Sequence, residues 1–158
     1  MSSLNNGVGD MTDKKYDSLK LCNQLCFPLY AASREITRKY KPFLDKLDLT
    51  YTQYITMLVL WEHGRISVSE LGEYLYLDSG TLTPLLKKLE KKNLITRNRS
   101  RDDERVLYVT LTDEGLAMRE EALAVPEGMK CNVTLTPEES AELYRILYKL
   151  LKSEDIAK

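Results

Sequence analysis

Apolar side chains recur at steps of three and four residues through most of this 158-residue chain, which is the spacing of amphipathic helices. The first such pattern covers residues 16–45. Pro28 and Pro42 should mark a start, a kink or a break in it, because proline lacks the amide donor and clashes with the preceding turn. Further helices are predicted over residues 51–62, 67–75, 79–93 and 112–123, and a last one begins at Thr136.

Capping residues support these boundaries. Thr50 with Gln53 and Ser67 with Glu70 have capping-box spacing. The other start signals are Asp78 or Ser79, Thr112, and Thr136 followed by Pro137. Residues 125–128, VPEG, should break the helix that begins at Thr112.

Two short segments change the period from helical to alternating, as β-strands do. Residues 95–99 and 106–111 flank the charged connector SRDDE, which has the length of a hairpin turn. A short helix–turn–helix followed by a hairpin is the winged-helix arrangement, in which the second helix enters a major groove. The sequence therefore predicts a mainly α fold with a small β-hairpin wing. A helical domain with an incidental hairpin is the alternative.

A single domain accounts for residues 1–158 at the usual domain size of roughly 150 residues. Residues 1–15 are expected to be a flexible tail, and residues 51–112 the winged helix. The flanking helices, within residues 16–50 and 113–158, are too long and too apolar to be satisfied within so small a domain. We expect them to form a dimerisation region with a second copy of the chain.

Composition narrows the class of protein. Apolar residues make up 43%, charged residues 30%, and the net charge of −1 shows no chain-wide basic field. A lone His63 and the absence of HExxH or CxxC pairs argue against a metal site, and no cofactor is expected. No apolar run approaches the ~20 residues of a membrane span, and the polar N-terminus is not a signal peptide. We expect a cytoplasmic protein with no membrane partner.

The neutral total hides a local excess of positive charge. Residues 87–105 carry eight cations and four anions, whereas residues 113–127 carry five acids and one arginine. Such a split suits a protein that presents one face to double-stranded DNA; a solvated charged face is the alternative. The candidate DNA contacts are Ser79, Thr81 and Thr83 at the start of the second short helix, and Lys87, Arg97, Arg99, Arg101 and Arg105 after it.

Three cysteines, Cys22, Cys26 and Cys131, cannot form a closed set of bridges within the chain, so a fold stapled by disulfides is excluded. Each is either a small buried hydrophobe or a reactive thiol. The residues around them distinguish these readings.

The chain resembles the MarR family of winged-helix repressors, and within it the organic-hydroperoxide-sensing (OhrR) branch. The resemblance covers roughly Leu25 to Leu123. DSGTLTPLLKKLE and DER are specific to the family, and LCF with LYAASRE to the branch. Cys22 is not part of the branch pattern, and Pro28 replaces a residue that is commonly apolar.

The resemblance implies roles for particular residues. Cys26 in LCF matches the peroxide-reactive cysteine, and Cys131 lies where two-cysteine members carry the resolving cysteine. Tyr40 and Tyr51 match tyrosines that hydrogen-bond the sulfur from the partner subunit. Ser79, Thr81 and Thr83 match recognition-helix positions, and Arg105 matches the wing-tip arginine of the minor groove.

The implied chemistry needs an ionised Cys26, because a thiolate rather than a thiol attacks a peroxide oxygen. The nearby helix start and the phenols of Tyr30, Tyr40 and Tyr51 are the stabilisers that the sequence offers. An organic hydroperoxide is the expected effector. Cys26 would form a sulfenic acid, condense with Cys131 of the other subunit and release operator DNA.

Three alternatives remain open at this point. A MarR-type repressor that answers to a small-molecule ligand or to hypochlorite would share the DNA-binding features. A thiol peroxidase would turn over peroxide at Cys26, but it would not need a winged helix. A purely structural helical dimer would show no salt-dependent binding to duplex DNA. We therefore expect a transcription regulator and not an enzyme.

Overall fold

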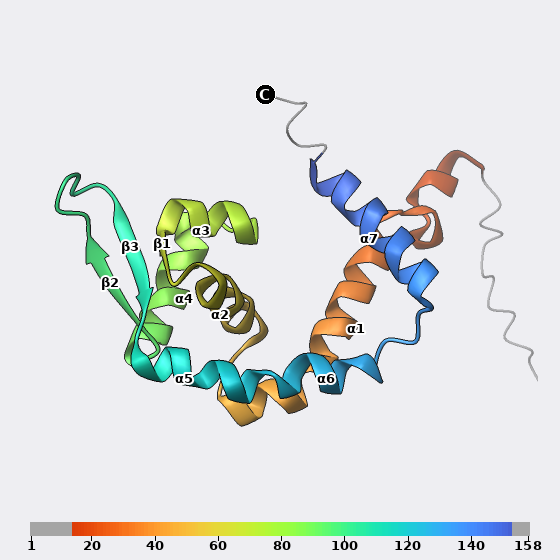
Figure 1. Cartoon of the computed structure of the whole chain (residues 1–158). Coiled ribbons are helices and arrows are strands. Elements are labelled where there is room, and N and C mark those ends of the chain that lie inside the picture. The colour runs from red at the N-terminus through yellow and green to blue at the C-terminus, as the bar shows by residue number, and fades with distance from the viewer. Residues whose placement is uncertain (1–13, 153–158) are drawn as a thin grey trace, which may run out of the picture. The chain divides into compact units, whose positions relative to one another are not determined.

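The structure, a computed structural model, describes residues 14–152 of the chain (Figure 1). Residues 1–38 and 39–158 form two compact units. Residues 1–13 of the predicted tail lie outside the described residues, and Lys14–Leu19 forms a short 3-10 helix, η1. Helix α1, Cys26–Leu44, begins in the first unit and ends in the second.

The first unit consists of η1, a second 3-10 helix, η2 (Leu21–Asn23), and the first turns of α1. The helical pattern predicted from residue 16 does not form one helix, because the chain is extended at Gln24 (φ −92°, ψ 108°). Of the outcomes predicted for Pro28, a helix start is confirmed, since α1 begins two residues before it. Pro28 explains where α1 begins. A missing amide costs no hydrogen bond in a first turn, but the proline ring excludes a helical turn before it.

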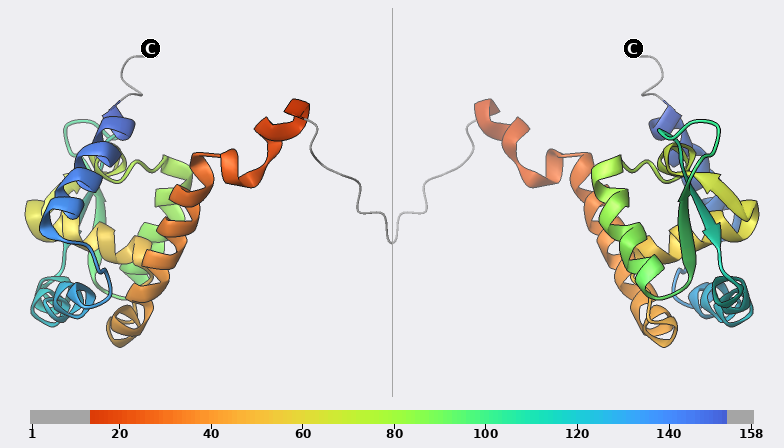
Figure 2. Two further views of the ribbon diagram at one scale, coloured as in Figure 1. Left: turned by 90° about the vertical axis from the view of Figure 1, so that its right-hand side faces the viewer. Right: turned by 90° about the vertical axis from the view of Figure 1, so that its left-hand side faces the viewer.

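The second unit contains the predicted winged helix. Its elements are α2 (Tyr51–His63), β1 (Arg65–Ser67), α3 (Val68–Leu75), α4 (Ser79–Lys91), β2 (Ile95–Arg99) and β3 (Leu107–Leu111). The strands pair antiparallel in the order β1-β3-β2, and Figure 2 shows the β2–β3 hairpin, the wing, from two further sides. The sequence did not predict β1, because three residues are too few to show an alternating pattern.

The predicted caps begin the helices of this unit. Thr50 and Ser67 both form complete capping boxes, at the starts of α2 and α3. Asp78, rather than Ser79, caps α4 by accepting from the Thr81 amide. The predictions for Thr112 and Thr136 are also confirmed: Thr112 accepts from the Gly115 amide, and Thr136 from the Glu139 amide.

Helix α5 (Asp113–Ala122) is followed almost at once by α6 (Ala124–Lys130), and later by α7 (Pro137–Lys152). The predicted break over residues 125–128 is wrong, because these residues are helical. Pro126 is the third residue of α6, where proline costs no hydrogen bond. Gly128 packs where a Cβ atom would overlap the ring of Phe43.

The core of the second unit is built mainly by α2, α3, α4 and the sheet, with Leu44 at the end of α1, Ala122 of α5 and Val125 of α6 at its edge. Four leucines of α4 are buried, namely Leu82, Leu85, Leu86 and Leu89. They join fully buried side chains of the neighbouring elements, among them Met57, Leu60, Leu71, Ile95 and Val109. Each fully buried side chain of this size contributes roughly 1.5–3 kcal/mol of hydrophobic stabilisation. This core holds α4 and the wing in place.

Apolar faces of α1 and α7 are exposed in the single chain. Leu29 and Ile36 of α1 are 46% and 36% exposed, and Leu143 and Ile146 of α7 are 42% and 41% exposed. Isolated exposed leucines are ordinary, but rows of them on two helices are typical of a surface that another chain covers. None of the helices within residues 14–152 is long and apolar enough to cross a membrane.

Candidate functional site

The start of α4 is the first candidate contact with DNA. Asp78 accepts from the Thr81 amide (2.9 Å) and the Thr81 hydroxyl (3.1 Å), and these bonds hold the pKa of its carboxyl below the usual range. The Thr83 hydroxyl donates to the carbonyl of Ser79 (2.7 Å). Because both threonine hydroxyls are engaged within the helix start, their methyl groups remain for contact with thymine methyls.

A groove joins this helix start to the wing. It has a volume of about 710 Å³, and α3, the start of α4 and the beginning of β3 line it. Ser79 and Arg105, two of the predicted DNA contacts, lie on the same groove together with Tyr76 and Glu73. The fold therefore brings the recognition helix and the wing arginine to one surface, as a winged helix needs for DNA.

The wing arginines differ in how they are held. Arg105 is 91% exposed and forms an ion pair with Asp103 (2.9 Å), which lowers the pKa of that carboxyl. Arg99 donates to the Glu104 carbonyl across the hairpin, and Arg101 is exposed at its turn. An exposed ion pair of this kind is worth little in water, so Arg105 can exchange Asp103 for a DNA group at small cost.

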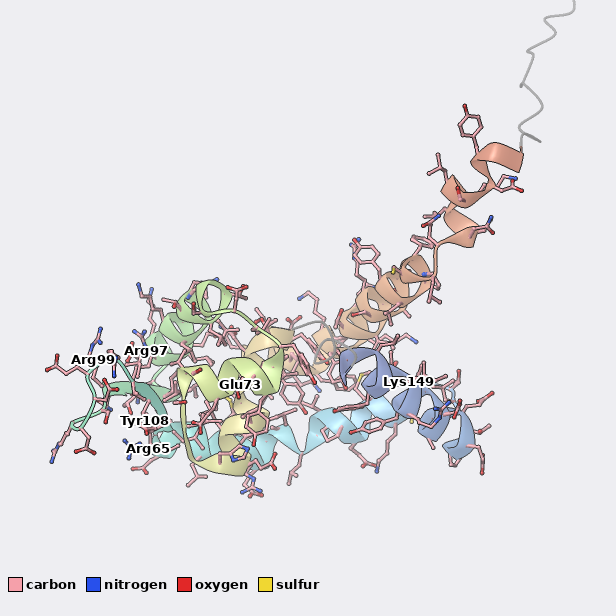
Figure 3. All side chains as sticks on the ribbon, turned by 90° about the horizontal axis from the view of Figure 1, so that it is seen from above. Arg65, Glu73, Arg97, Arg99, Tyr108 and Lys149 are labelled. Atoms are coloured by element: carbon pink, nitrogen blue, oxygen red, sulfur yellow. The ribbon has the colours of Figure 1, made fainter. Side chains whose placement is uncertain are left out.

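Arg97 has a different environment. Its guanidinium contacts Glu90 of α4 (2.6 Å), its amide donates to the same carboxylate (3.2 Å), and its side chain is only 19% exposed. Arg97 and Arg99 are labelled in Figure 3, where both extend from β2. Arg97 therefore joins the wing to α4, and it is less available to phosphates than the other wing arginines.

Sequence reasoning missed one cation near the wing. The Arg65 guanidinium of β1 lies over the Tyr108 ring of β3, 4.0 Å from its centroid, and both are labelled in Figure 3. Arg65 lies opposite Thr110 in the pairing of β1 with β3, so it adds a positive charge on strand β1. Because β1 itself was not predicted, sequence reasoning could not place Arg65 beside Tyr108.

Cys26 is the first residue of α1 and is exposed. Tyr30 follows one turn later, and its hydroxyl oxygen accepts from Arg34 (3.0 Å), whose guanidinium also lies 5.5 Å from the ring centroid. Arg34 was not predicted as a site residue. Its i+4 spacing from Tyr30 was the available signal.

Tyr40 and Tyr51, the other two predicted tyrosines, lie together in the second unit. Their ring centroids are 5.0 Å apart, and the ring of Tyr54 lies 6.1 Å from that of Tyr40. Burial, reinforced by Tyr40, raises the pKa of Tyr51 and of Tyr54. These two phenols are therefore protonated at neutral pH and can act as donors. Within residues 14–152, the hydroxyls of Tyr40 and Tyr51 have no hydrogen-bond partner.

The remaining thiols are also free and exposed. Cys131 is the C-cap of α6, and Cys22 lies in η2, where its sulfur contacts the Asn23 side chain (3.7 Å). Among the residues that the structure describes, no three His, Cys, Asp or Glu side chains gather as a metal site would need.

Comparisons with known proteins agree with this geometry. Residues 38–121 match the family model described as transcriptional regulator SarA/Rot. The chain is 49% identical over 141 residues to the organic hydroperoxide resistance transcriptional regulator of Bacillus subtilis, which covers 89% of this chain and 96% of that protein.

Solved structures give the same result. Reduced AbfR bound to DNA, from Staphylococcus epidermidis, is 37% identical with a TM-score of 0.71, covering 88% of this chain and 97% of that one. Disulfide-formed AbfR has a TM-score of 0.60 at 37% identity, with coverage of 87% and 96%. A MarR variant from E. coli complexed with operator DNA is 28% identical with a TM-score of 0.70, covering 80% and 93%.

These relatives are transcription regulators, which confirms the expectation of a regulator rather than an enzyme. The predicted winged-helix fold is likewise confirmed. The chain belongs to the MarR-type family of winged-helix transcriptional regulators, on the branch of the organic hydroperoxide regulators.

Proposed function

We propose that this protein is a redox-controlled repressor that binds operator DNA as a reduced homodimer and releases it when an organic hydroperoxide oxidises Cys26. The observation that carries the proposal is an exposed cysteine at the start of α1, in a chain 49% identical to a hydroperoxide resistance regulator. The relative's name supports the effector class, and the exposed sulfur supports the site of attack.

The surface formed by Ser79, Thr81, Thr83, Lys87 and the wing arginines is the proposed DNA interface. Its support is the shared groove of Ser79 and Arg105, and the DNA-bound state of the reduced AbfR relative. The start of α4 would enter the major groove, and Arg105 would enter the adjacent minor groove.

A homodimer is the proposed binding unit. Its support is the apolar surface on α1 and α7 that the single chain leaves exposed. A two-fold pair would cover these faces and present two copies of α4 to half-sites about one helical turn apart.

The proposed chemistry has two steps. The Cys26 thiolate attacks the distal oxygen of the hydroperoxide, the O–O bond breaks, and the alkoxide takes a proton to leave as an alcohol. The resulting sulfenic acid then condenses with the Cys131 thiol of the other subunit, so that a disulfide forms and water leaves. A protonated phenol such as Tyr51, donated by the partner subunit, stabilises the sulfur anion before the first step.

Release of DNA follows from the way α5 and α6 are joined to the wing. Strand β3 ends at Leu111, Thr112 caps α5, and α6 follows with Leu123 alone between them. A displacement of Cys131 at the end of α6 would therefore be transmitted through α6 and α5 to the wing. Small tilts are sufficient to separate two recognition helices from successive half-sites.

The test is a gel shift on the DNA upstream of the protein's own gene, with and without cumene hydroperoxide, run beside a non-reducing gel. Wild type should bind and be released by the oxidant. Cys26→Ser should bind and ignore it, and Cys131→Ser should respond without forming a covalent dimer. Cys22→Ser is the matched control and should behave as wild type.

The same experiment separates the alternatives. A Cys26→Ser protein that is still released by cumene hydroperoxide contradicts the proposed sensor. If hypochlorite releases the wild-type protein from DNA and organic hydroperoxide does not, hypochlorite replaces organic hydroperoxide as the proposed effector.

A further inference from the structure

The turn that carries Cys131 is fastened to the last turns of α1 by contacts that the functional site does not use. The Lys39 Nζ donates to the backbone carbonyl of Asn132 (2.7 Å), and the Lys39 side chain is partly buried there. One turn further along α1, the Phe43 ring fills the space that a side chain at Gly128 would need. The end of α1 and α6 are adjacent in Figure 1.

Asn132 is also held by α6. Its Nδ2 donates to the Gly128 carbonyl (2.8 Å), and its amide donates to the Met129 carbonyl (2.9 Å). Three hydrogen bonds therefore fix the residue directly after Cys131, while the Cys131 side chain is exposed. The Cys131 thiol is open to solvent, while the next residue is held by hydrogen bonds to both α1 and α6.

A disulfide imposes a geometric demand on this turn. The two Cα atoms must come within about 7 Å with a restricted dihedral angle, so a sulfur on a held backbone reaches only a partner that already lies beside it. Of these three hydrogen bonds, the Lys39 bond joins the turn after α6 to α1, and it is strengthened by the charge on the donor.

We propose that Lys39 is a latch, a positioning residue that holds the Cys131 turn in the reduced protein and limits the rate at which Cys131 attacks the Cys26 sulfenic acid. The proposal rests on the proposed resolving role of Cys131. Lys39 takes no part in the chemistry: the S–OH bond of Cys26 breaks, the S–S bond forms, and the thiol proton leaves with water. Release of the Asn132 carbonyl precedes that step.

The chain offers a matched control on the same helix. Lys41 lies two residues after Lys39 and forms an exposed ion pair with Asp45 (2.7 Å), within the same stretch of chain. Lys39→Met removes the donor and retains most of the side-chain length, Lys41→Met removes the control cation, and Lys39→Arg restores a donor. Asn132→Ala removes the side-chain bond to Gly128 as a second route to a looser turn.

Three measurements are made on each full-length variant. Hydrogen exchange of the reduced protein over residues 128–134 should be about tenfold faster in Lys39→Met, the effect of one charge-assisted hydrogen bond. Stopped-flow oxidation followed by non-reducing gels should show disulfide formation faster by a similar factor. Trapping of the Cys26 sulfenic acid should show an unchanged rate of formation. Lys41→Met and Lys39→Arg should match wild type, and Asn132→Ala should resemble Lys39→Met.

If hydrogen exchange over residues 128–134 is unchanged in both Lys39→Met and Asn132→Ala, the latch is overturned, whatever the rate of disulfide formation. Faster exchange with an equal or slower rate of disulfide formation shows that the hold does not limit the reaction, and it overturns the proposal as well. If wild type forms the sulfenic acid but never the link to Cys131, the resolving role in the proposed function fails. Exchange then still distinguishes whether Lys39 holds the turn.

Discussion

Gly115 shows how one residue determines the junction between the winged helix and α5. Its carbonyl accepts from the Trp61 indole (2.8 Å), and its amide donates to the Thr112 hydroxyl (3.0 Å). A Cβ atom there would overlap the Leu94 carbonyl. The position needs glycine for close packing. Gly64 needs glycine for its backbone conformation instead: its φ is +70°, and a Cβ atom there would have nothing within 4 Å.

Gly115→Ala should therefore lower the free energy of unfolding more than Gly64→Ala. A backbone overlap in a packed junction costs about 2–4 kcal/mol, whereas an alanine at positive φ in open space costs about 1 kcal/mol. Urea unfolding of both variants, followed by the fluorescence of Trp61, measures the difference. Equal losses would mean that the junction relaxes around the added methyl group.

Between elements, the decisive contact is the ion pair of Glu90 and Arg97, which joins α4 to the wing. The hydrogen bond from Arg97 is the main cause of the lowered pKa of Glu90. The contact ties β2 to α4, so it helps to position the wing arginines that are proposed as DNA contacts. Arg97, predicted as a DNA contact, is positioned for this structural role.

Glu90→Gln should lower the free energy of unfolding at pH 7 by about 1 kcal/mol, the worth of a charge-assisted bond in a partly exposed pair. Because the folded pKa of Glu90 is lowered, its stabilisation is complete above the unfolded pKa of about 4.3 and is lost as the pH falls through the folded value. Urea unfolding at pH 7 and pH 3 should show the two proteins converging in acid. A difference that persists at pH 3 would contradict an electrostatic origin.

For the whole molecule, the exposed apolar faces of α1 and α7 are the basis of the proposed dimer. The buried cluster of the second unit includes Leu44 at the end of α1, but it includes none of the exposed residues Leu29, Ile36, Leu143 and Ile146. These exposed faces are therefore available to stabilise a pair of chains. To that extent, the folding of the winged helix does not depend on the association of two chains.

Leu143→Glu should shift the protein towards monomer without unfolding the winged helix, because a carboxylate would have to be buried in an apolar interface. Arg145→Glu on the same helix is the control, since Arg145 pairs with Glu142 (2.6 Å) on the polar side. Sedimentation velocity measures the effect, and a loss of operator binding should accompany it. A Leu143→Glu protein that sediments as wild type would place the interface elsewhere.

Much of the fold follows from local patterns. Capping residues predicted the starts of the helices in the second unit, and alternation predicted both strands of the wing. The errors have local causes too. Pro28 was compatible with a kink within a helix or with a helix start, and Pro126 with a break or with the first turn of α6. In each case proline has the same local chemistry, and only the packed structure selects between the two outcomes.

The sequence by itself determined the helices of the winged helix, the wing and the candidate reactive side chains, because caps, periodicity and motifs involve residues within a few positions of one another. Tertiary structure alone decided that β1 completes the sheet and that Arg97 binds Glu90. It also decided that Lys39 holds the Asn132 carbonyl, 93 positions away in the chain. These contacts depend on which surfaces meet when the core closes, and no local pattern of residues specifies that.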